Sequence, residues 1–106
     1  VHRGKRLMRE STVALAISDL LPTGAELSGT WVEGNGFGAG GISGKGENEG
    51  LYGWSGAAGT IGYANTKYKL RIWLYTQYMP QEALPVLRDF PKAVGADLLA
   101  LKGRKK

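Results

Sequence analysis

Residues 51–60 of this 106-residue chain, with the sequence LYGWSGAAGT, have the clearest potential for chemistry. Ser55 could act as a nucleophile or a hydrogen-bond donor. The small residues from Gly56 to Gly59 would leave backbone N–H groups accessible, and an N–H aimed at developing negative charge contributes about 3–4 kcal/mol in oxyanion holes. The same small residues would equally let a helix pack closely on a sheet. Both interpretations are open at this point.

Several catalytic patterns match only in part. The run GFGAGG from Gly36 to Gly41 satisfies G-x-G-x-x-G, but we expect no helix after it to receive a pyrophosphate. The run GWSGA around Ser55 lacks the last glycine of a nucleophile elbow, and only His2 could serve as its base. No serine is followed three residues later by lysine, the residue that helps to deprotonate serine in Ser-x-x-Lys enzymes. The sequence therefore offers no activated nucleophile of a known kind.

The composition excludes several classes of site. The chain has no cysteine and one histidine, which excludes disulfides, cysteine-based metal or thiol chemistry, and a cluster of histidine ligands. No apolar run approaches the ~20 residues needed to cross a bilayer, and no signal-peptide pattern opens the chain. We expect one small domain over residues 1–101, with no metal, no cofactor and no membrane anchor. The compartment stays open.

The positive charge is concentrated at the C-terminal end. The chain has 14 Lys and Arg against 9 Asp and Glu, a net charge of +5. Lys102, Arg104, Lys105 and Lys106 supply four of these charges, which leaves +1 for the rest. We interpret residues 102–106 as a basic tail. Nucleic-acid binding usually needs basic residues interleaved with aromatic ones across a folded face, so the pattern does not favour it.

The elements that must position residues 51–60 can be predicted in outline. Apolar residues at helical spacing predict a helix from Thr12 to Leu21, capped by Ser11 and ended by Pro22. The aromatic and glycine-rich stretch from Gly34 to Gly62 predicts short strands joined by turns, with a polar loop from Gly44 to Gly50.

The alternating stretch from Lys69 to Tyr78 predicts a strand in a hairpin with Thr60 to Ala64. Bulky residues on both faces indicate a central strand with a layer on each side. Because proline interrupts a helix, the last segment predicts a kinked helix or two helices, from Gln81 to Asp89 and from Pro91 to Leu101. The fold class is therefore α+β, with an antiparallel sheet of three to four strands flanked by an N-terminal and a C-terminal helix.

Three segments together resemble the C-terminal part of the serine β-lactamase-related hydrolases, a group of class C β-lactamases, penicillin-binding-protein-like peptidases and esterases. They are Gly36-Phe37-Gly38, the stretch from Leu51 to Thr60, and the run TQYMP from Thr76 to Pro80. The resemblance runs from about Gly4 to Pro80, and more weakly into the terminal helix. It implies part of a β-lactamase-like fold, about the last quarter of a family domain.

The resemblance assigns roles to four residues. Trp54-Ser55-Gly56 matches the Trp-x-Gly strand of the esterase-like members. Trp54 would then wall the substrate pocket, Ser55 would offer its hydroxyl to the acid or ester group, and Gly56 would let the acyl group lie close to the strand. Ala57 would give its backbone N–H as half of the oxyanion hole.

The departures from the family pattern shape the expected function. The Ser-x-x-Lys nucleophile is absent, Tyr63-Ala64-Asn65 spells Tyr-x-Asn but follows the Trp-x-Gly strand instead of preceding it, and Pro91 interrupts the terminal helix. We therefore expect the C-terminal part of a hydrolase of acyl esters or amides, inactive alone, whose partners are a complementary N-terminal part and a small acyl substrate.

Two alternatives remain from the sequence. The chain could be a non-catalytic, glycine-rich binding or structural module whose basic tail adds weak, salt-sensitive attraction to anions. It could also fail to fold alone, because a sheet taken out of a larger one exposes an edge and an apolar face that favour self-association.

Overall fold

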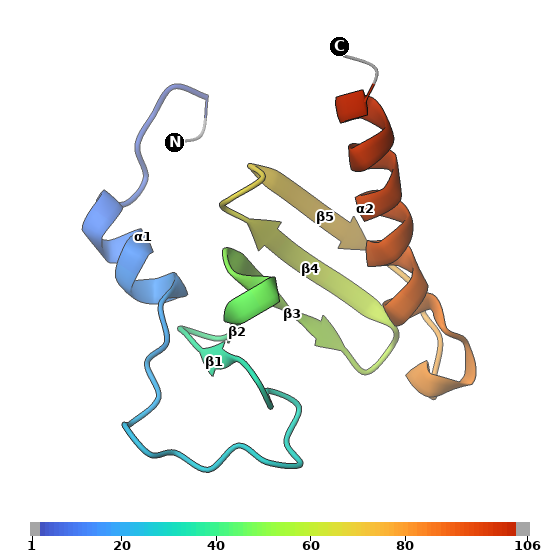
Figure 1. Cartoon of the computed structure of the whole chain (residues 1–106), viewed down its shortest axis with the longest axis horizontal. Helices are drawn as coiled ribbons and strands as arrows, with labels where there is room; N and C mark the ends of the chain where they lie inside the picture. Colours follow the sequence, from blue (N-terminus) through green and yellow to red (C-terminus); the bar gives the residue numbers. More distant parts are fainter. Residues whose placement is uncertain (1–2, 104–106) are drawn as a thin grey trace. The chain divides into compact units, whose positions relative to one another are not determined.

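The computed structural model describes residues 3–103, except for the side chains of Glu82 and Lys102, and has an α+β fold (Figure 1). Arg104, Lys105 and Lys106 of the predicted basic tail lie outside the described residues. In chain order the elements are α1 (Glu10–Ile17), β1 (Gly36–Phe37), β2 (Ile42–Ser43), the 3-10 helix η1 (Gly46–Asn48), β3 (Leu51–Gly56), β4 (Thr60–Asn65), β5 (Leu70–Leu74), the 3-10 helix η2 (Gln81–Ala83) and α2 (Val86–Gly103).

The five strands form one open antiparallel sheet in the order β1-β2-β3-β4-β5. Strand β2 pairs with β1 through Phe37↔Ile42, and with β3 through Ile42↔Gly53 and Ser43↔Tyr52. The prediction of three to four strands was wrong. Strands β1 and β2 lie in the glycine-rich stretch where strands were expected, but two residues each are too few for an alternating pattern to give their number.

The chain divides into two compact units. The first consists of Val1–Trp54 and Tyr63–Arg71, and the second of Ser55–Gly62 and Ile72–Lys106. Among the described residues Ile61, in the second unit, is the one hydrophobic side chain in the buried core, with 3% of its surface exposed. The expectation of a single domain over residues 1–101 stays a prediction.

Helix α1 is shorter than predicted and shifted toward the N-terminus. It begins at Glu10 and not at Thr12, with Arg9 in the capping position, so Ser11 lies inside the first turn. It ends at Ile17 and not at Leu21, because the following residues bond elsewhere. The Ser18 hydroxyl donates to Leu15 O at 2.8 Å, and the Leu20 amide donates to Phe37 O at 2.8 Å.

Asp19 fastens the segment that follows α1. Its carboxylate accepts hydrogen bonds from the amides of Leu21 and Phe37, at 3.1 and 3.0 Å, and lies 2.6 Å from Lys45 Nζ. The Lys45 ammonium and these two amides favour the charged form, and they lower the pKa of Asp19 from 3.8 to about 2. Three separate segments of the first unit therefore meet at one carboxylate.

The predicted hairpin is present as β4 and β5, joined by a turn over residues 66–69. Strand β5 begins at Leu70 because Lys69 takes a positive φ of 52°, and it ends at Leu74, four residues before the predicted Tyr78. The expectation of a central strand was wrong, since β5 is the last strand of the sheet. Trp73 is 56% exposed and Tyr75, just beyond the strand, is 82% exposed.

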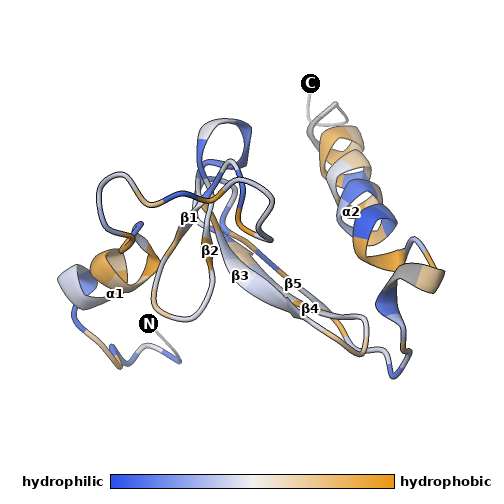
Figure 2. Cartoon of the chain, turned by 90° about the horizontal axis from the view of Figure 1, so that it is seen from below, coloured by the Kyte–Doolittle hydropathy of each residue, from blue (hydrophilic) through white to orange (hydrophobic). Residues whose placement is uncertain are grey.

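The C-terminal segment forms the short η2 and then one helix, α2, so the prediction of two helices was wrong, whereas the alternative of a kink at Pro91 stays a prediction. Pro91 lies inside α2, at its sixth residue. Figure 2 shows apolar and hydrophilic patches along this helix. Its half-buried apolar residues recur at helical spacing: Val86, Leu87, Phe90, Val94 and Leu98.

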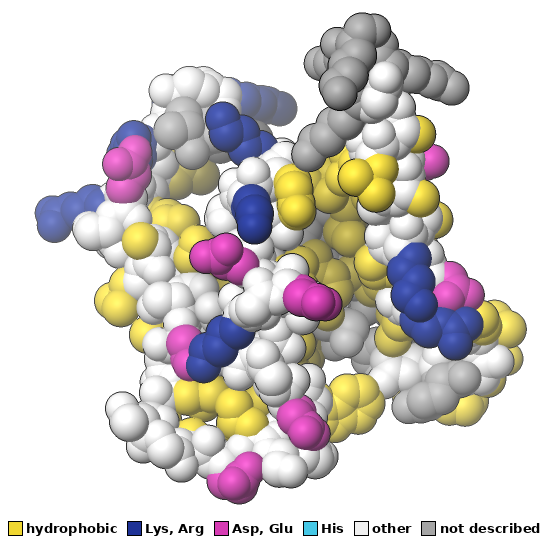
Figure 3. Space-filling model, viewed as in Figure 1, with side chains coloured by type: hydrophobic (Ala, Val, Ile, Leu, Met, Phe, Trp, Pro, Cys, Tyr) yellow, Lys and Arg dark blue, Asp and Glu magenta, His cyan; other side chains and the backbone are white. Residues whose placement is uncertain are grey.

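Surface side chains of both charge signs are scattered over the face drawn in Figure 3, with exposed hydrophobic side chains between them. No helix among residues 3–103 has the length and apolar character needed to cross a membrane.

Candidate functional site

The candidate site lies at the end of β3 and in the turn after it. Trp54, Ser55 and Gly56 are the last three residues of β3, and Ala57 is the first residue of the turn over residues 57–59 that leads into β4. Strand β3 pairs with β2 at Tyr52 and Gly53, which belong to the first unit, whereas Ser55, Gly56 and Ala57 belong to the second unit.

The hydrogen bond within the turn sets the direction of the Ala57 amide. Gly56 O accepts from Gly59 N at 3.0 Å, so this carbonyl points into the turn. Across a trans peptide bond the C=O and the next N–H point in opposite directions. The Ala57 N–H therefore points out of the turn. Ala57 itself is exposed, and none of the backbone hydrogen bonds of the turn uses its amide.

The turn has the properties of a type I β-turn. Its central residues, Ala57 and Ala58, both lack a positive φ, and the bond from Gly59 N to Gly56 O closes it. Gly59 has φ +75°, which glycine adopts without steric cost. A Cβ built on Gly56 would overlap Thr60 Oγ1, so a larger residue at position 56 would disturb the start of β4.

Thr76 and Tyr78 anchor the same turn, and sequence reasoning assigned them no role. Ala58 O accepts the Thr76 hydroxyl at 2.7 Å and the Tyr78 amide at 3.1 Å. The TQYMP run contributed to the family resemblance, but no pattern in the sequence links Thr76 to a carbonyl 18 residues away. Its closeness follows from the fold, which returns the chain after β5 to the β3–β4 turn.

Trp54 belongs to the first unit and has an aromatic partner there. Its ring meets Phe37 edge to face, with centroids 5.5 Å apart and planes at 86°, and it remains 41% exposed. Tyr52, two residues earlier and so on the same face of β3, donates its hydroxyl to Ala39 O. The Trp54 ring thus has a fixed orientation and a free surface that an apolar group can cover.

Ser55 is half-buried, and its hydroxyl makes no hydrogen bond to any group in the described part of the chain. No basic side chain in the described part of the chain is hydrogen-bonded to Ser55, and His2 is outside the described residues. The role of this hydroxyl toward a substrate stays a prediction.

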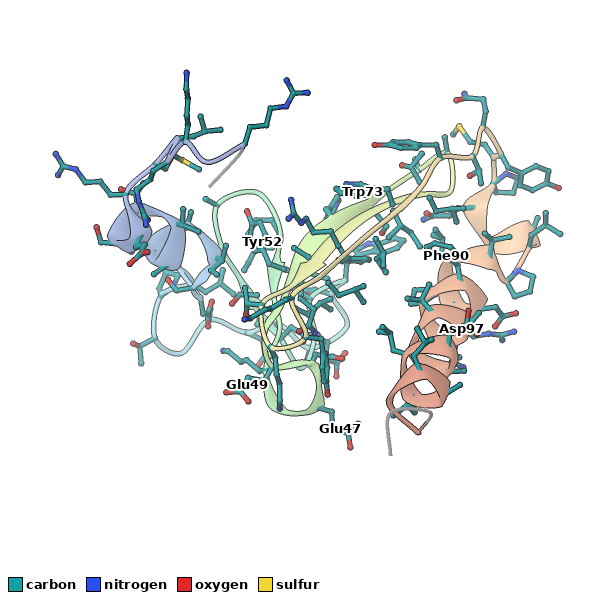
Figure 4. The ribbon with its side chains drawn as sticks, turned by 90° about the horizontal axis from the view of Figure 1, so that it is seen from above. Glu47, Glu49, Tyr52, Trp73, Phe90 and Asp97 are labelled. Carbon is teal, nitrogen blue, oxygen red and sulfur yellow. The ribbon has the colours of Figure 1, made fainter. Side chains whose placement is uncertain are left out.

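The remaining sequence motifs do not converge on this site. Glu47 and Glu49 extend outward from the loop that contains η1, and Glu49 lies 3.7 Å from Lys67 Nζ (Figure 4). Tyr63 and Asn65 lie on β4, within the hairpin, as the sequence indicated. Within residues 3–103 no three His, Cys, Asp or Glu residues are grouped so that they could hold a metal ion.

Comparison with protein-family models, curated protein sequences and solved structures found no significant match to this chain.

Proposed function

We propose that this chain is the C-terminal part of a β-lactamase-related serine hydrolase of acyl esters or amides. It would supply the strand along which the substrate lies and one of the two oxyanion donors. A complementary N-terminal part would supply the Ser-x-x-Lys nucleophile, which is absent from this sequence.

The observation that carries the proposal is the direction of the Ala57 N–H. An oxyanion donor must point at open space where a substrate oxygen can sit, and it must be held there before the reaction begins. The Ala57 amide points out of a turn that is closed by its own hydrogen bond, and Ala57 is exposed. The side chain of Ala57 is a single methyl group.

The proposed reaction uses this amide in two steps. The serine oxygen of the complementary part attacks the acyl carbon, its proton passes to the neighbouring lysine, and the carbonyl oxygen becomes an oxyanion that the Ala57 N–H stabilises. Collapse of this intermediate expels the alcohol or amine, which takes up the proton. Water then releases the acid from the acyl-enzyme by the same route. Ser55 would donate its hydroxyl to the acid or ester group, and Trp54 would cover the acyl group.

The exposure of the chain supports a partial domain. A domain of about 100 residues normally buries a substantial hydrophobic core, whereas Ile61 alone forms the buried hydrophobic core among the described residues. Large side chains such as Trp31, Trp73 and Tyr75 are 56–82% exposed. Surfaces of this kind usually lie against further polypeptide.

A chimeric hydrolase tests the proposal. The N-terminal part of a β-lactamase-related esterase, truncated where the resemblance begins near Gly4, is fused to this chain and assayed with a chromogenic ester and a cephalosporin. Ala57→Pro is the decisive variant, because proline suits the second position of a type I turn, removes the N–H and places its ring Cδ where the oxyanion would sit. We expect a fall in kcat of about 100-fold or more, as for the loss of one oxyanion donor.

Ala57→Ser is the matched control, since it keeps the N–H and should retain activity. The isolated chain should release no burst of product, and a burst of one equivalent per chain would contradict the missing nucleophile. A folded chimera that hydrolyses neither substrate would refute the proposal and favour the glycine-rich binding module considered above.

A further inference from the structure

Two hydrogen bonds and two peptide groups, all in the second unit, connect the Thr76 hydroxyl to the Ala57 N–H. The Thr76 hydroxyl donates to Ala58 O at 2.7 Å. The peptide that carries this carbonyl also carries the Gly59 N–H, which donates to Gly56 O at 3.0 Å. The peptide that carries Gly56 O in turn carries the Ala57 N–H. Two peptide planes thus lie in series between the hydroxyl and the amide.

The geometry points to Thr76 as a positioning residue that orients and strengthens the Ala57 N–H through this series, which we name the Thr76 relay. The inference rests on the proposed function, because it concerns the same donor. A donor on Ala58 O draws electron density toward that oxygen and makes the Gly59 N–H a stronger donor. The stronger bond to Gly56 O polarises the next peptide in the same direction, so the Ala57 N–H becomes more positive.

The surroundings favour such a relay. Thr76 and Ala58 are half-buried and Gly59 is buried, so water competes weakly for these groups. Gly59 is also the residue that lets the hydroxyl approach, because a Cβ there would lie 2.5 Å from Thr76 Oγ1. The Tyr78 amide donates to the same Ala58 carbonyl, which keeps the turn in place when the hydroxyl is removed.

The chain contains a matched control for the Thr76 hydroxyl. Gly50 O accepts the Thr66 hydroxyl at 3.3 Å and the Thr66 amide at 2.9 Å, so this carbonyl also has one hydroxyl and one amide donor. Thr66 belongs to the first unit, and its hydrogen bonds do not lead to Ala57. Thr66→Val therefore removes a comparable hydroxyl without breaking the relay.

NMR spectroscopy of the isotope-labelled full chain tests the relay without any assay of hydrolysis. Thr76→Val should move the amide proton signals of Gly59 and Ala57 upfield, Thr76→Ser should restore both, and Thr66→Val should move neither. An Ala57 signal that ignores Thr76→Val, or that Thr76→Ser fails to restore, would overturn the inference. In the unaltered chain, absence of the through-hydrogen-bond coupling between Gly59 N and the Gly56 carbonyl carbon would also overturn it, even if Thr76→Val does not fold.

The chimeric hydrolase separates this inference from the proposed function. Strengthening of 10–30% at each of two hydrogen bonds in series changes the contribution of one oxyanion donor by at most about 9%, which corresponds to a fall in kcat of at most about twofold in Thr76→Val, with KM unchanged and activity restored by Thr76→Ser. An inactive chimera whose Ala57 signal still responds to Thr76 would refute the hydrolase and leave the relay standing. An active chimera whose kcat ignores Thr76→Val would refute the catalytic effect of the relay alone.

Discussion

Replacing Gly59 by alanine perturbs the turn at a residue that combines a positive φ with a close neighbour. Gly59 has φ +75°, and a Cβ at this position would lie 2.5 Å from Thr76 Oγ1, where ordinary contacts begin at 3.4 Å. The substitution therefore imposes two separate penalties. One is backbone strain in the left-handed region, and the other is an overlap that the Thr76 hydroxyl can relieve only by moving away from Ala58 O.

The two penalties can be estimated separately. A non-glycine residue in the left-handed region costs about 1–2 kcal/mol, and the loss of one intramolecular hydrogen bond costs about 1 kcal/mol. Gly59→Ala should therefore destabilise the second unit by about 2–3 kcal/mol. In a Thr76→Ala background the overlap and the bond are both absent, so the same substitution should cost only about 1–2 kcal/mol.

Urea unfolding of the wild type, both single variants and the double variant measures this difference as a coupling free energy of about 1 kcal/mol. The unfolding of the second unit is followed by hydrogen exchange of its own amides, so that the first unit does not obscure it. Gly24→Ala, at φ +81° with no atom within 4 Å of the added Cβ, gives an independent value for strain alone. Strictly additive effects of Gly59→Ala and Thr76→Ala would refute the contact on which the Thr76 relay depends.

Three further predictions concern other parts of the chain. Because the pKa of Asp19 is lowered from 3.8 to about 2, its contribution to stability should be complete above pH 3.8 and lost as the pH falls toward 2. Asp19→Asn should abolish this pH dependence in acid unfolding curves. Lys45→Gln should raise the pKa of Asp19 in an NMR titration. The edge-to-face pair of Phe37 and Trp54 should show a coupling of about 1 kcal/mol in a double-mutant cycle with leucine at both positions, and a value near zero would mean that the rings do not support each other. Pro91→Ala should raise helical content by circular dichroism and stabilise α2 by up to about 3 kcal/mol, since it adds the missing N–H; an unchanged or lower melting temperature would indicate that the proline is accommodated without cost.

Local patterns in the sequence were sufficient for the α+β class, the β4–β5 hairpin and the existence of both helices. The hairpin could be predicted because strong alternation over Leu70, Ile72 and Leu74 meets turn residues at 66–69. Element ends were less predictable. Helix α1 stops at Ile17 because Asp19 and Leu20 bond to Phe37, and a contact across 18 residues leaves no local trace.

For the candidate site, too, one part could be predicted from the sequence and another part required the tertiary structure. The resemblance to a known family pointed to Trp54, Ser55, Gly56 and Ala57 without coordinates, and their roles stay predictions. The direction of the Ala57 N–H and the hydrogen bond from Thr76 to the turn required the three-dimensional arrangement. Each of these depends on hydrogen bonds that form only after distant segments have come together, and residue order does not encode such bonds locally.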